Sequence, residues 1–489
     1  MSVSTAALPP TVRDANDADY VLARRHLPIL MLDRMEPFRP VAVGYHVFYE
    51  SGPSPSFPRV VELGEPAPAR CQAVIEYAFW WDWDIQHLYE LEHAWVYVGE
   101  SGRVEKVEAS WHGEFRDMRL GREGGAALRG DRPVLYVKPG KHAFGAHPAD
   151  FEPEREQVVA ACGRLAGWHG VWETPLYAGR MPANTPLARR VVHTYLHERR
   201  FAPSFVFDVE DAGETWPMAP WPELEAWIPQ RVEYLLQELK TAIEPRRRRW
   251  LRIATRGSSE EHIENSAAAF RKARQREADM IEIDVRLTAD GVAVVIHDDT
   301  LERTTTGSGR VREHTREALR PFRLRNQHAG EVSEDAVMTL DEVLALAREE
   351  MLGVYIDVKD ADAVTAIADA IRAHGFQRYV IVGSGDREVL RRFREECPDV
   401  LTSWLVGWPA PPVAELLEAL QEVSATYLHP CWENAADRPD QLLTREDVAL
   451  VHAAGKGIIT WHEERAEVIA GLRELGVDGV CSNRPEMLV

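Results

Sequence analysis

The stretch EADMIEIDVRLTADGVAVVIHDD (277–299) contains two apolar runs that carry polar residues inside or directly after them. In the first run Glu282 and Asp284 are two residues apart, so both side chains leave an extended strand on the same face. The second run ends at His297. This stretch predicts a strand with two carboxylates on one face, followed by a histidine at the end of the next apolar run.

Apolar runs of strand length alternate with helical stretches from residue 250 to the end of the chain. About eight strands fit into 489 − 248 = 241 residues, which suits a TIM (β/α)8 barrel of typically about 250 residues. A doubly wound open α/β sheet is the alternative. The predicted strands are WLRIAT (250–255), ADMIEIDV (278–285), LGVYIDVK (352–359), YVIVGS (379–384), LTSWLVGW (401–408), SATYLH (424–429), GIITWH (457–462) and GVDGVCSN (476–483).

Residues 1–248 have a different composition, with ten of the 15 tryptophans and short alternating runs such as CQAVIEYAFW (71–80). These runs predict a β-rich, sandwich-like domain, and the helical spacing of residues 222–244 predicts a helical extension. Since 489 residues exceed what one hydrophobic core organises, we expect two domains, 1–248 and 249–489. The basic run EPRRRR (244–249) is interpreted as a linker; a nucleic-acid or membrane patch is the alternative.

The chain holds 57 Lys and Arg against 78 Asp and Glu, a net charge of −21. This balance argues against nucleic acid as a partner, but it does not exclude a small anionic substrate in a locally positive pocket. Five scattered cysteines, no signal-peptide pattern and no apolar stretch of membrane-spanning length predict a cytoplasmic protein with no membrane span.

Further polar residues stand at the ends of the predicted barrel strands, where barrel enzymes carry their chemistry. Strand one ends in Thr255-Arg256-Gly257, and strand three carries Asp357 and Lys359, again two residues apart. With Glu282 and Asp284, Asp357 would complete a set of three carboxylates. Oxygen ligands without cysteine favour Mg²⁺ or Ca²⁺. A helix cap or a salt bridge is the alternative role for any one of these acids.

Several motifs of this region resemble the glycerophosphodiester phosphodiesterase family. They are RGSSEEHIENSAAAF (256–270), EADMIEIDVRLTADGVAVVIHDDTLERTTTGSG (277–309), VMTLDEVL (337–344), YIDVK (355–359) and GVDGVCSNRP (476–485). The resemblance implies a TIM barrel of lipid metabolism that cleaves phosphodiesters with a divalent cation. It also implies the site residues: Glu282, Asp284 and Asp357 for the metal, Arg256 and Lys359 for the phosphate, His297 for acid/base chemistry, and Trp461 for the substrate.

Three positions depart from the family pattern, one of them His462, which follows Trp461 where the family typically has threonine. Asp357 stands where the family usually has Glu, one methylene longer, and Thr255 replaces the histidine of a His-Arg-Gly motif. Threonine has no pKa in the range for proton transfer. The barrel would then be an inactive binder, or would work with one histidine while the substrate or a water on the cation fills the other role, or another histidine would substitute: His262, His429 or His462.

We therefore expect a metal-dependent phosphodiester hydrolase, or an enzyme of a related phosphoryl rearrangement, acting on a small phosphodiester. The competing expectation is an inactive barrel that binds a phosphorylated ligand, with a separate metal or binding function in the N-terminal domain. A Thr255→His variant separates these readings, because activity that appears only in the variant would favour the binder.

The N-terminal segment WWDWDIQHLYELEHAWVYV (80–98) places His87, Glu90 and Glu92 on one run. With SWHG (110–113) and RPVLYVKPGKHAFGAHP (132–148) it is similar to the β-sandwich group of necrosis-inducing and vacuolar-sorting-protein-62-like proteins. That resemblance implies a second metal site at these three residues, for Zn²⁺, Mn²⁺ or Mg²⁺. Polar residues at a sheet edge are the alternative. Trp80, Trp81 and Trp83 are expected to pack in the core rather than to stack on a ligand.

Overall fold

The computed structural model of the protein describes residues 9–10, 17–63, 71–213, 215–326 and 330–489. The chain divides into two compact units. The first comprises Met1–Asn184 and Val191–Ile243, and the second comprises Thr185–Arg190 and Glu244–Val489. The main division thus falls five residues before the boundary expected at 248, and one short segment of the N-terminal half belongs to the second unit.

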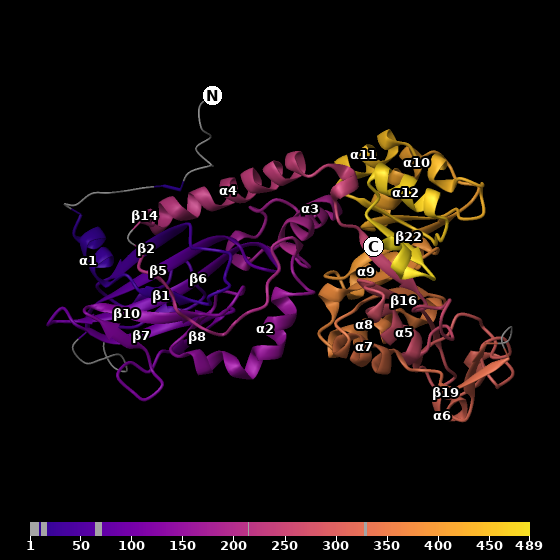
Figure 1. Ribbon diagram of the computed structural model, residues 1–489, viewed down its shortest axis with the longest axis horizontal. Helices are drawn as coiled ribbons and strands as arrows, with labels where there is room; N and C mark the ends of the chain where they lie inside the picture. Colours follow the sequence, from indigo (N-terminus) through magenta and orange to yellow (C-terminus); the bar gives the residue numbers. More distant parts are fainter. Residues whose placement is uncertain (1–8, 11–16, 64–70, 214, 327–329) are drawn as a thin grey trace. The chain divides into compact units, whose positions relative to one another are not determined.

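In its described residues the first unit contains two main β-sheets (Figure 1). One has the order β11-β10-β1-β13, with β9 added to β10; the other has the order β14-β2-β5-β6-β7-β8, with β12 added to β6. The strands of the first sheet are β1 (Ile29–Leu32), β9 (Ala127–Arg129), β10 (Arg132–Val137), β11 (Phe144–Gly145) and β13 (Val209–Asp211). Those of the second are β2 (Ala42–Phe48), β5 (Cys71–Trp83), β6 (His87–Gly99), β7 (Val104–Trp111), β8 (Glu114–Asp117), β12 (Gly170–Val171) and β14 (Met218–Pro220).

Aromatic side chains fill the space between these sheets. Phe79 of β5 packs edge-on against Phe144 of β11, with ring centroids 5.2 Å apart. Trp80 and Trp81 are fully buried, and the ring of Trp83 lies 4.2 Å from that of Tyr195. The prediction that these tryptophans serve packing is confirmed, since burying aromatic surface of this size is a major source of stability.

Helices and one small hairpin complete the first unit. The predicted helical extension is confirmed as α4, which packs on β2 through one apolar face (Figure 1). The other strands and α-helices are β3 (Gly52–Pro53), β4 (Val60–Val61), α1 (Ala18–His26), α2 (Arg155–Cys162) and α4 (Trp221–Ala242), with the part of α3 (Pro186–His197) that follows Arg190. Among the helices of the described ranges, none has both the length and the hydropathy that a membrane span requires.

The described part of the second unit contains eight parallel strands that close into a barrel, because β15 pairs with both β16 and β25. This closure confirms the predicted TIM barrel and excludes the open sheet. The barrel strands, in order around the barrel, are β15 (Leu251–Thr255), β16 (Met280–Leu287), β20 (Gly353–Val358), β21 (Val380–Ser384), β22 (Leu401–Gly407), β23 (Tyr427–Cys431), β24 (Gly457–Thr460) and β25 (Gly479–Ser482).

Helices surround the barrel strands (Figure 1). Their apolar faces and the outward-facing strand residues form the main hydrophobic clusters of this unit. Strands such as β20 are buried along their whole length, as expected for parallel strands covered by helices. The helices are α5 (Ala267–Gln275), α6 (Arg316–Leu319), α7 (Leu340–Glu349), α8 (Val364–Ala373), α9 (Arg387–Glu396), α10 (Val413–Glu422), α11 (Arg445–Ala453) and α12 (Ala466–Leu475).

The longest connection of the barrel follows β16. It contains β17 (Ala293–Val295), which pairs antiparallel with β16, then α6, and then the hairpin of β18 (Arg323–Asn326) and β19 (Glu331–Ala336). Because it leaves the carboxyl end of a barrel strand, this connection lies at the face where barrel enzymes build their active sites.

The segment Thr185–Arg190 is held in the second unit by the guanidinium group of Arg190. Its Nη1 donates to the carbonyl of Gly476 at 2.7 Å, and its Nη2 donates to the carbonyl of Arg248 at 2.9 Å. Nη1 also lies 3.3 Å from Oδ1 of Asp478, whose other oxygen is 2.9 Å from Nε2 of His452. This buried carboxylate therefore has a cationic or hydrogen-bonding partner at each oxygen.

The predicted linker at residues 244–249 forms a short 3₁₀ turn, Pro245–Arg247. Arg246 pairs with Glu244, and Arg249 lies 2.7 Å from Asp279.

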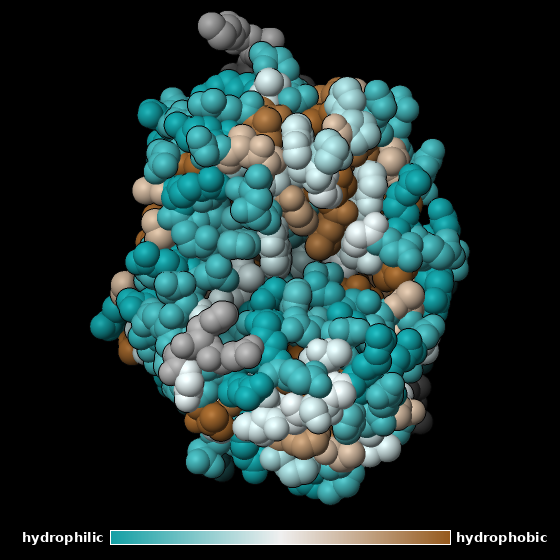
Figure 2. Space-filling view, turned by 90° about the vertical axis from the view of Figure 1, so that its right-hand side faces the viewer, coloured by the Kyte–Doolittle hydropathy of each residue, from teal (hydrophilic) through white to brown (hydrophobic). Residues whose placement is uncertain are grey.

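Figure 2 shows one face of the molecule, where hydrophilic side chains predominate and apolar ones gather in a patch above a hollow. Most of this face is thus polar surface.

Candidate active site

Three carboxylates converge at the carboxyl end of the barrel strands. Glu282 and Asp284 leave the same face of β16, and Asp357 leaves β20 opposite Asp284 in the strand register. All three are buried, and each offers an oxygen within 4.8 Å of the others. The one-methylene shortening at Asp357 therefore does not remove it from the cluster.

The charge balance of these carboxylates is incomplete. Burial, and then the negative charge of Asp284, raise the pKa of Glu282 well above its ordinary value. Burial opposes ionisation of Asp284 too, but the positive charges of Arg256 and Lys359 outweigh it and lower the pKa of Asp284. Among the described residues, Oε1 of Glu282 has no hydrogen-bond partner. A buried carboxylate oxygen without a partner is costly, and a hard cation would satisfy it.

Two basic side chains border the carboxylates. Nζ of Lys359 lies 2.6 Å from Oδ2 of Asp357 and 3.1 Å from Oδ1 of Asp284, and Nε of Arg256 lies 3.1 Å from Oδ2 of Asp284. The backbone N–H of Arg256 donates to Oε2 of Glu282 at 2.9 Å. The site therefore places three buried carboxylates beside two basic side chains, a charge arrangement that is compatible with phosphoryl chemistry.

The turn after β15 positions Arg256. Its φ of +53° lies in the left-handed region, and Gly257 follows with a φ of +84°. A Cβ on Gly257 would lie 2.7 Å from the backbone of Ala269, so only glycine fits there. This turn directs the Arg256 side chain toward Asp284 rather than along the strand.

His297 lies after β17 on the long connection that follows β16. Its Nδ1 is 2.6 Å from Oδ1 of Asp298, and Arg303 holds Asp298 from the other side. The hydrogen bond from Arg303 lowers the pKa of Asp298, so this carboxylate is ionised and can orient the imidazole. Arg303 also binds Glu264, which in turn contacts Nη1 of Arg256 at 3.2 Å. A chain of ion pairs thus connects His297 to Arg256.

Comparison with known proteins identifies the second unit. The family model described as "Glycerophosphoryl diester phosphodiesterase family" matches residues 256–487. A glycerophosphodiester phosphodiesterase of Caldanaerobacter subterraneus subsp. tengcongensis is 30% identical over 242 residues, 48% of this chain and 95% of the relative. The chain belongs to this family. It is therefore a phosphoric diester hydrolase of the glycerophosphoryl diester phosphodiesterase family.

Other known proteins match the same half of the chain. A glycerophosphodiester phosphodiesterase of Bacillus subtilis is 27% identical, covering 49% of this chain and 85% of the relative. The crystal structure of an Agrobacterium tumefaciens member has 25% identity and a TM-score of 0.43, covering 48% of this chain and 97% of that one. An Oleispira antarctica phosphodiesterase in complex with the product sn-glycerol-3-phosphate has 23% identity and a TM-score of 0.42, covering 48% and 94%.

The histidines that could substitute for the one missing at Thr255 lie in different environments. Thr255 is buried at the end of β15, beside Glu282 in the register, and its hydroxyl has no hydrogen-bond partner among the described residues. His262 is exposed in the following loop. His429 is buried in β23, its Nδ1 is 2.6 Å from the hydroxyl of Tyr355, and burial lowers its pKa to about 3.

His462 has a different environment from these residues. It lies two residues beyond β24, partly exposed, with Nδ1 3.1 Å from Oε2 of Glu464. Trp461, expected to contact the substrate, is half-buried, with its ring centroid 5.8 Å from that of His462 and 5.9 Å from that of His429. Of these histidines, His462 is the one that combines partial exposure with a carboxylate partner.

Several site residues were missed in the sequence. Asn265 donates to Oδ2 of Asp284 at 3.2 Å, and Glu264, Asp298 and Arg303 form the ion-pair chain described above. Glu264 and Asn265 lie inside the quoted motif RGSSEEHIENSAAAF, and Asp298 follows His297 directly. Their position in the motif was a signal, but their contacts depend on how the loops fold back over β16.

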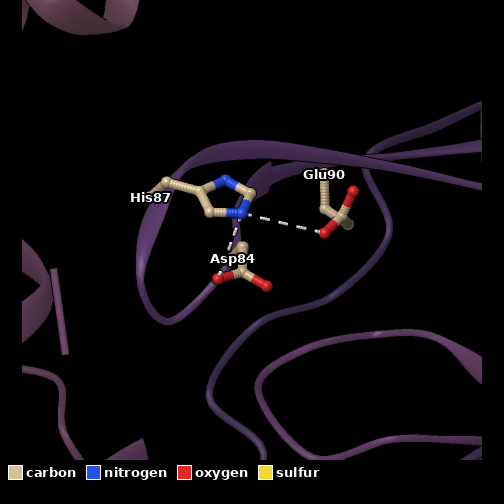
Figure 3. Close-up of side chains that lie close together, drawn as sticks. All are labelled: Asp84, His87 and Glu90. Carbon is tan, nitrogen blue, oxygen red and sulfur yellow. Dashed lines mark ion pairs between the residues drawn. The ribbon is translucent and has the colours of Figure 1, made fainter. Parts of the chain in front are cut away.

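A second cluster of possible metal ligands lies in the first unit, around the turn between β5 and β6 (Figure 3). Nε2 of His87 lies 3.6 Å from Oδ1 of Asp84 and 4.0 Å from Oε2 of Glu90. Glu90 also lies within 4.8 Å of ligand atoms of Glu92 and His112. The expected residues His87 and Glu92 thus belong to two neighbouring groups that share Glu90, and the structure adds Asp84 to the first group and His112 to the second.

A hydrogen bond at Nδ1 fixes the tautomer of His87. Nδ1 lies 2.8 Å from the backbone carbonyl of Tyr89, so Nδ1 carries the hydrogen and Nε2 presents a lone pair. Burial lowers the pKa of His87 to about 4, so the ring is neutral at pH 7. A lone pair that faces two carboxylates beyond hydrogen-bond distance is an arrangement that a cation would stabilise.

His87, Glu90, Glu92 and His112 of this cluster line a cavity of about 830 Å³ within the first unit. Glu90, Glu92 and His112 contribute polar groups to the wall, and most of the remaining wall is apolar or aromatic. Trp172 stacks on His87, with ring centroids 5.1 Å apart. A cavity of this size that combines an apolar wall with a few convergent polar groups is typical of a small-molecule site.

Proposed function

We propose that the protein hydrolyses a glycerophosphodiester to an alcohol and a phosphomonoester at the carboxyl end of its barrel, with a divalent cation. The observation that carries the proposal is the convergence of three buried carboxylates with Arg256 and Lys359. The substrate class is supported by the names of the similar proteins, which are glycerophosphodiester phosphodiesterases.

Glu282, Asp284 and Asp357 would hold the cation, since the unpartnered Oε1 of Glu282 and the all-oxygen donor set fit Mg²⁺ or Ca²⁺. A bound cation would supply positive charge for the phosphoryl oxygens. Arg256 and Lys359, released from part of their contact with the carboxylates, would bind the non-bridging oxygens of the phosphate.

His297 would act as general base on the attacking water. Its Nδ1 is held by Asp298, which leaves Nε2 to accept a proton. Trp461 would pack against the alcohol part of the substrate, because its ring is half-buried beside His462. We place this activity in the cytoplasm and in lipid metabolism. All five cysteines are free thiols, as is usual in a reducing compartment, and glycerophosphodiesters are deacylated phospholipids.

The test is hydrolysis of a panel of phosphodiesters by the full chain, after removal of metal with EDTA and after addition of Mg²⁺ or Ca²⁺. We expect activity to disappear with EDTA and to return with one of these ions. Loss of a neighbour of a metal ligand typically costs 10- to 100-fold, so loss of the proposed ligand in Glu282→Gln should cost about 100-fold or more.

His262→Gln is the matched control for this experiment, because His262 is exposed and outside the proposed site. The proposal is wrong if the native protein binds a phosphate ester and a divalent cation but turns over no diester. That result would establish the barrel as a binding protein.

We further propose that Asp84, His87 and Glu90, assisted by Glu92 and His112, bind a second cation in the first unit (Figure 3). The specific support is the lone pair of His87 Nε2, which faces two carboxylates. Nitrogen and oxygen ligands together suit Zn²⁺, Mn²⁺ or Mg²⁺.

Metal analysis of the full chain, after equilibration with each ion and dialysis, tests this second site. We expect two ions in the native protein and one in each of His87→Asn and Glu282→Gln, with none in the double variant. An unchanged metal content in His87→Asn would contradict the second site, whatever the result at the barrel.

A further inference from the structure

His462 occupies the end of a barrel strand that lies close to the missing histidine in the barrel order. It follows β24, and β25 separates β24 from β15, which ends at Thr255. Since adjacent strands are about 4.8 Å apart, the two positions belong to strands about 10 Å apart at the same barrel end. A group at the end of β24 can therefore face the same substrate as a group at the end of β15.

Glu464 orients the imidazole of His462. Its Oε2 lies 3.1 Å from Nδ1 of His462, while its Oε1 accepts hydrogen bonds from the hydroxyl of Ser482 at 3.2 Å and from the backbone N–H of Asn483 at 2.8 Å. A carboxylate fixed in this way holds the hydrogen on Nδ1 and leaves Nε2 as the reactive nitrogen.

Asn483 connects this pair to the loop that contains Arg256. Its side-chain oxygen accepts from the hydroxyl of Ser259 at 2.8 Å, and its backbone N–H donates to Glu464, the partner of His462. Ser259 is three residues beyond Arg256, so the loop that would bind the phosphate and the residues that hold His462 share a hydrogen-bonded contact.

The charges that face His462 come from three strand ends: Glu464 after β24, Glu433 after β23 and Arg256 after β15. Burial lowers the pKa of His462, but the hydrogen bond to Glu464 and the charges of Glu464 and Glu433 outweigh burial and the repulsion from Arg256. The pKa of His462 is therefore raised above its ordinary value, which favours the protonated ring.

We propose that His462 is the general acid of the hydrolysis and takes the role of the histidine that Thr255 replaces. This inference rests on the proposed function. In the reaction, a water oxygen forms a bond to phosphorus as His297 accepts the water proton. The bond from phosphorus to the leaving oxygen breaks, and the proton on Nε2 of His462 passes to that oxygen. The products are an alcohol and a phosphomonoester, and proton exchange with solvent restores both histidines.

The leaving group of the substrate separates this role from a structural one. An alkyl alcohol leaves poorly without a proton, whereas p-nitrophenolate leaves without one. We expect His462→Gln to lower kcat/KM for an alkyl glycerophosphodiester by about 10²- to 10⁴-fold. The same variant should lower kcat/KM for a p-nitrophenyl phosphodiester by less than about tenfold. His297→Gln, which removes the base, should impair both substrates alike.

Glu464→Gln provides a second measurement that a merely structural role would not give. Because Glu464 raises the pKa of His462, the alkaline limb of the pH profile for the alkyl substrate should move to lower pH in this variant. In His462→Gln that limb should be absent.

The outcomes separate this inference from the proposed function. If the native protein hydrolyses diesters and His462→Gln lowers both substrates equally, or neither, the role of His462 is wrong and the proposed function stands. If the native protein hydrolyses no diester, both are wrong. Circular dichroism of each variant shows whether a loss comes from misfolding, and the p-nitrophenyl assay provides the same check through activity.

Discussion

The carboxylate clusters of the two units differ in the cations that accompany them. In the barrel, Arg256 and Lys359 contact Asp284 directly, and the cluster uses oxygen atoms alone. In the first unit, Asp84 contacts Lys141 at 2.8 Å, and the other ligand atoms belong to His87, Glu90, Glu92 and His112. The barrel site suits a hard cation and an anionic substrate, while the first unit offers a mixed ligand set beside an apolar cavity.

The largest effect is expected from Lys359→Met, which removes one of the two positive groups from the barrel cluster. Loss of one preorganised positive group that faces the developing charge typically costs 10²- to 10³-fold. We expect kcat/KM for a glycerophosphodiester to fall by that factor while the barrel cation binds more tightly, because a competing ammonium is gone. Steady-state kinetics and cation titration measure both effects. Equal activity in Lys359→Met and the native protein would contradict the phosphate-binding role, and Lys359→Arg should be intermediate.

Asp478 provides the contrast of a buried carboxylate that is fully paired. Burial opposes its ionisation, but His452 and Arg190 outweigh burial and lower its pKa. Its stabilisation is therefore present above the unfolded pKa of about 3.9 and is lost as pH falls through the lower folded value.

Asp478→Asn should destabilise the second unit by about 3–5 kcal/mol, because it leaves Arg190 buried without its counter-charge. Thermal unfolding at pH 7 measures the effect, and the difference between the variant and the native protein should shrink below pH 4. A difference that grows on acidification would contradict the pairing.

Lys141→Met tests the corresponding positive charge in the cluster of the first unit. Removal of the ammonium beside Asp84 should raise the affinity of that cluster for Mn²⁺ or Zn²⁺ by about tenfold, since one nearby charge changes an interaction by about one pKa unit or 1.4 kcal/mol. Titration of the full chain in the Glu282→Gln background isolates this site. Unchanged affinity would mean that the ion does not contact Asp84.

The double variant Thr255→His/His462→Gln tests whether the ends of β15 and β24 serve one function. Restoring the family histidine should recover about tenfold of the alkyl-diester activity lost in His462→Gln. The recovery is partial because Thr255 is buried and a larger ring must displace its neighbours. No recovery in a folded double variant would assign the two positions to different roles.

The smallest effect is expected for the stability of the metal-free protein in Glu282→Gln. The pKa of Glu282 is raised, so its contribution to stability falls as pH rises above its ordinary value. Replacement by neutral glutamine should therefore stabilise the metal-free protein by about 1 kcal/mol at pH 8, as other changes at strained active sites do. Thermal unfolding in EDTA measures this difference. A lower melting temperature for the variant than for the native protein would contradict the claim that the Glu282 carboxylate destabilises the metal-free site.

Period-2 patterns made much of the barrel site predictable. Glu282 and Asp284 share a face because alternate residues of any strand do, and a strand-end location follows from the barrel fold. The pairing of Asp284 with Asp357 depends on the register between two strands, which closure of the barrel sets. Asp84 was missed because it lies in the turn before β6, outside the run that begins at His87.

Most of the site features that the sequence did not predict are contacts between loops. The ion-pair chain through Glu264 and Arg303 joins two loops that are about 40 residues apart in the chain, and no local pattern encodes such a meeting. The role inferred for His462 required Glu464 and Asn483 to be placed beside it, whereas the sequence offered three candidate histidines and favoured His262 and His462 alike.

Arg190 has a consequence for how this chain can be divided. The polypeptide enters the second unit at Thr185, leaves it after Arg190 and returns at Glu244. A fragment that starts at residue 244 or 249 would therefore keep every barrel strand yet lose the guanidinium that binds Gly476, Arg248 and Asp478. A relative that aligns with half of this protein consists almost entirely of the matched region. In this chain, by contrast, Arg190 of the preceding sequence contacts the barrel unit, so truncation at a single position would remove part of that unit.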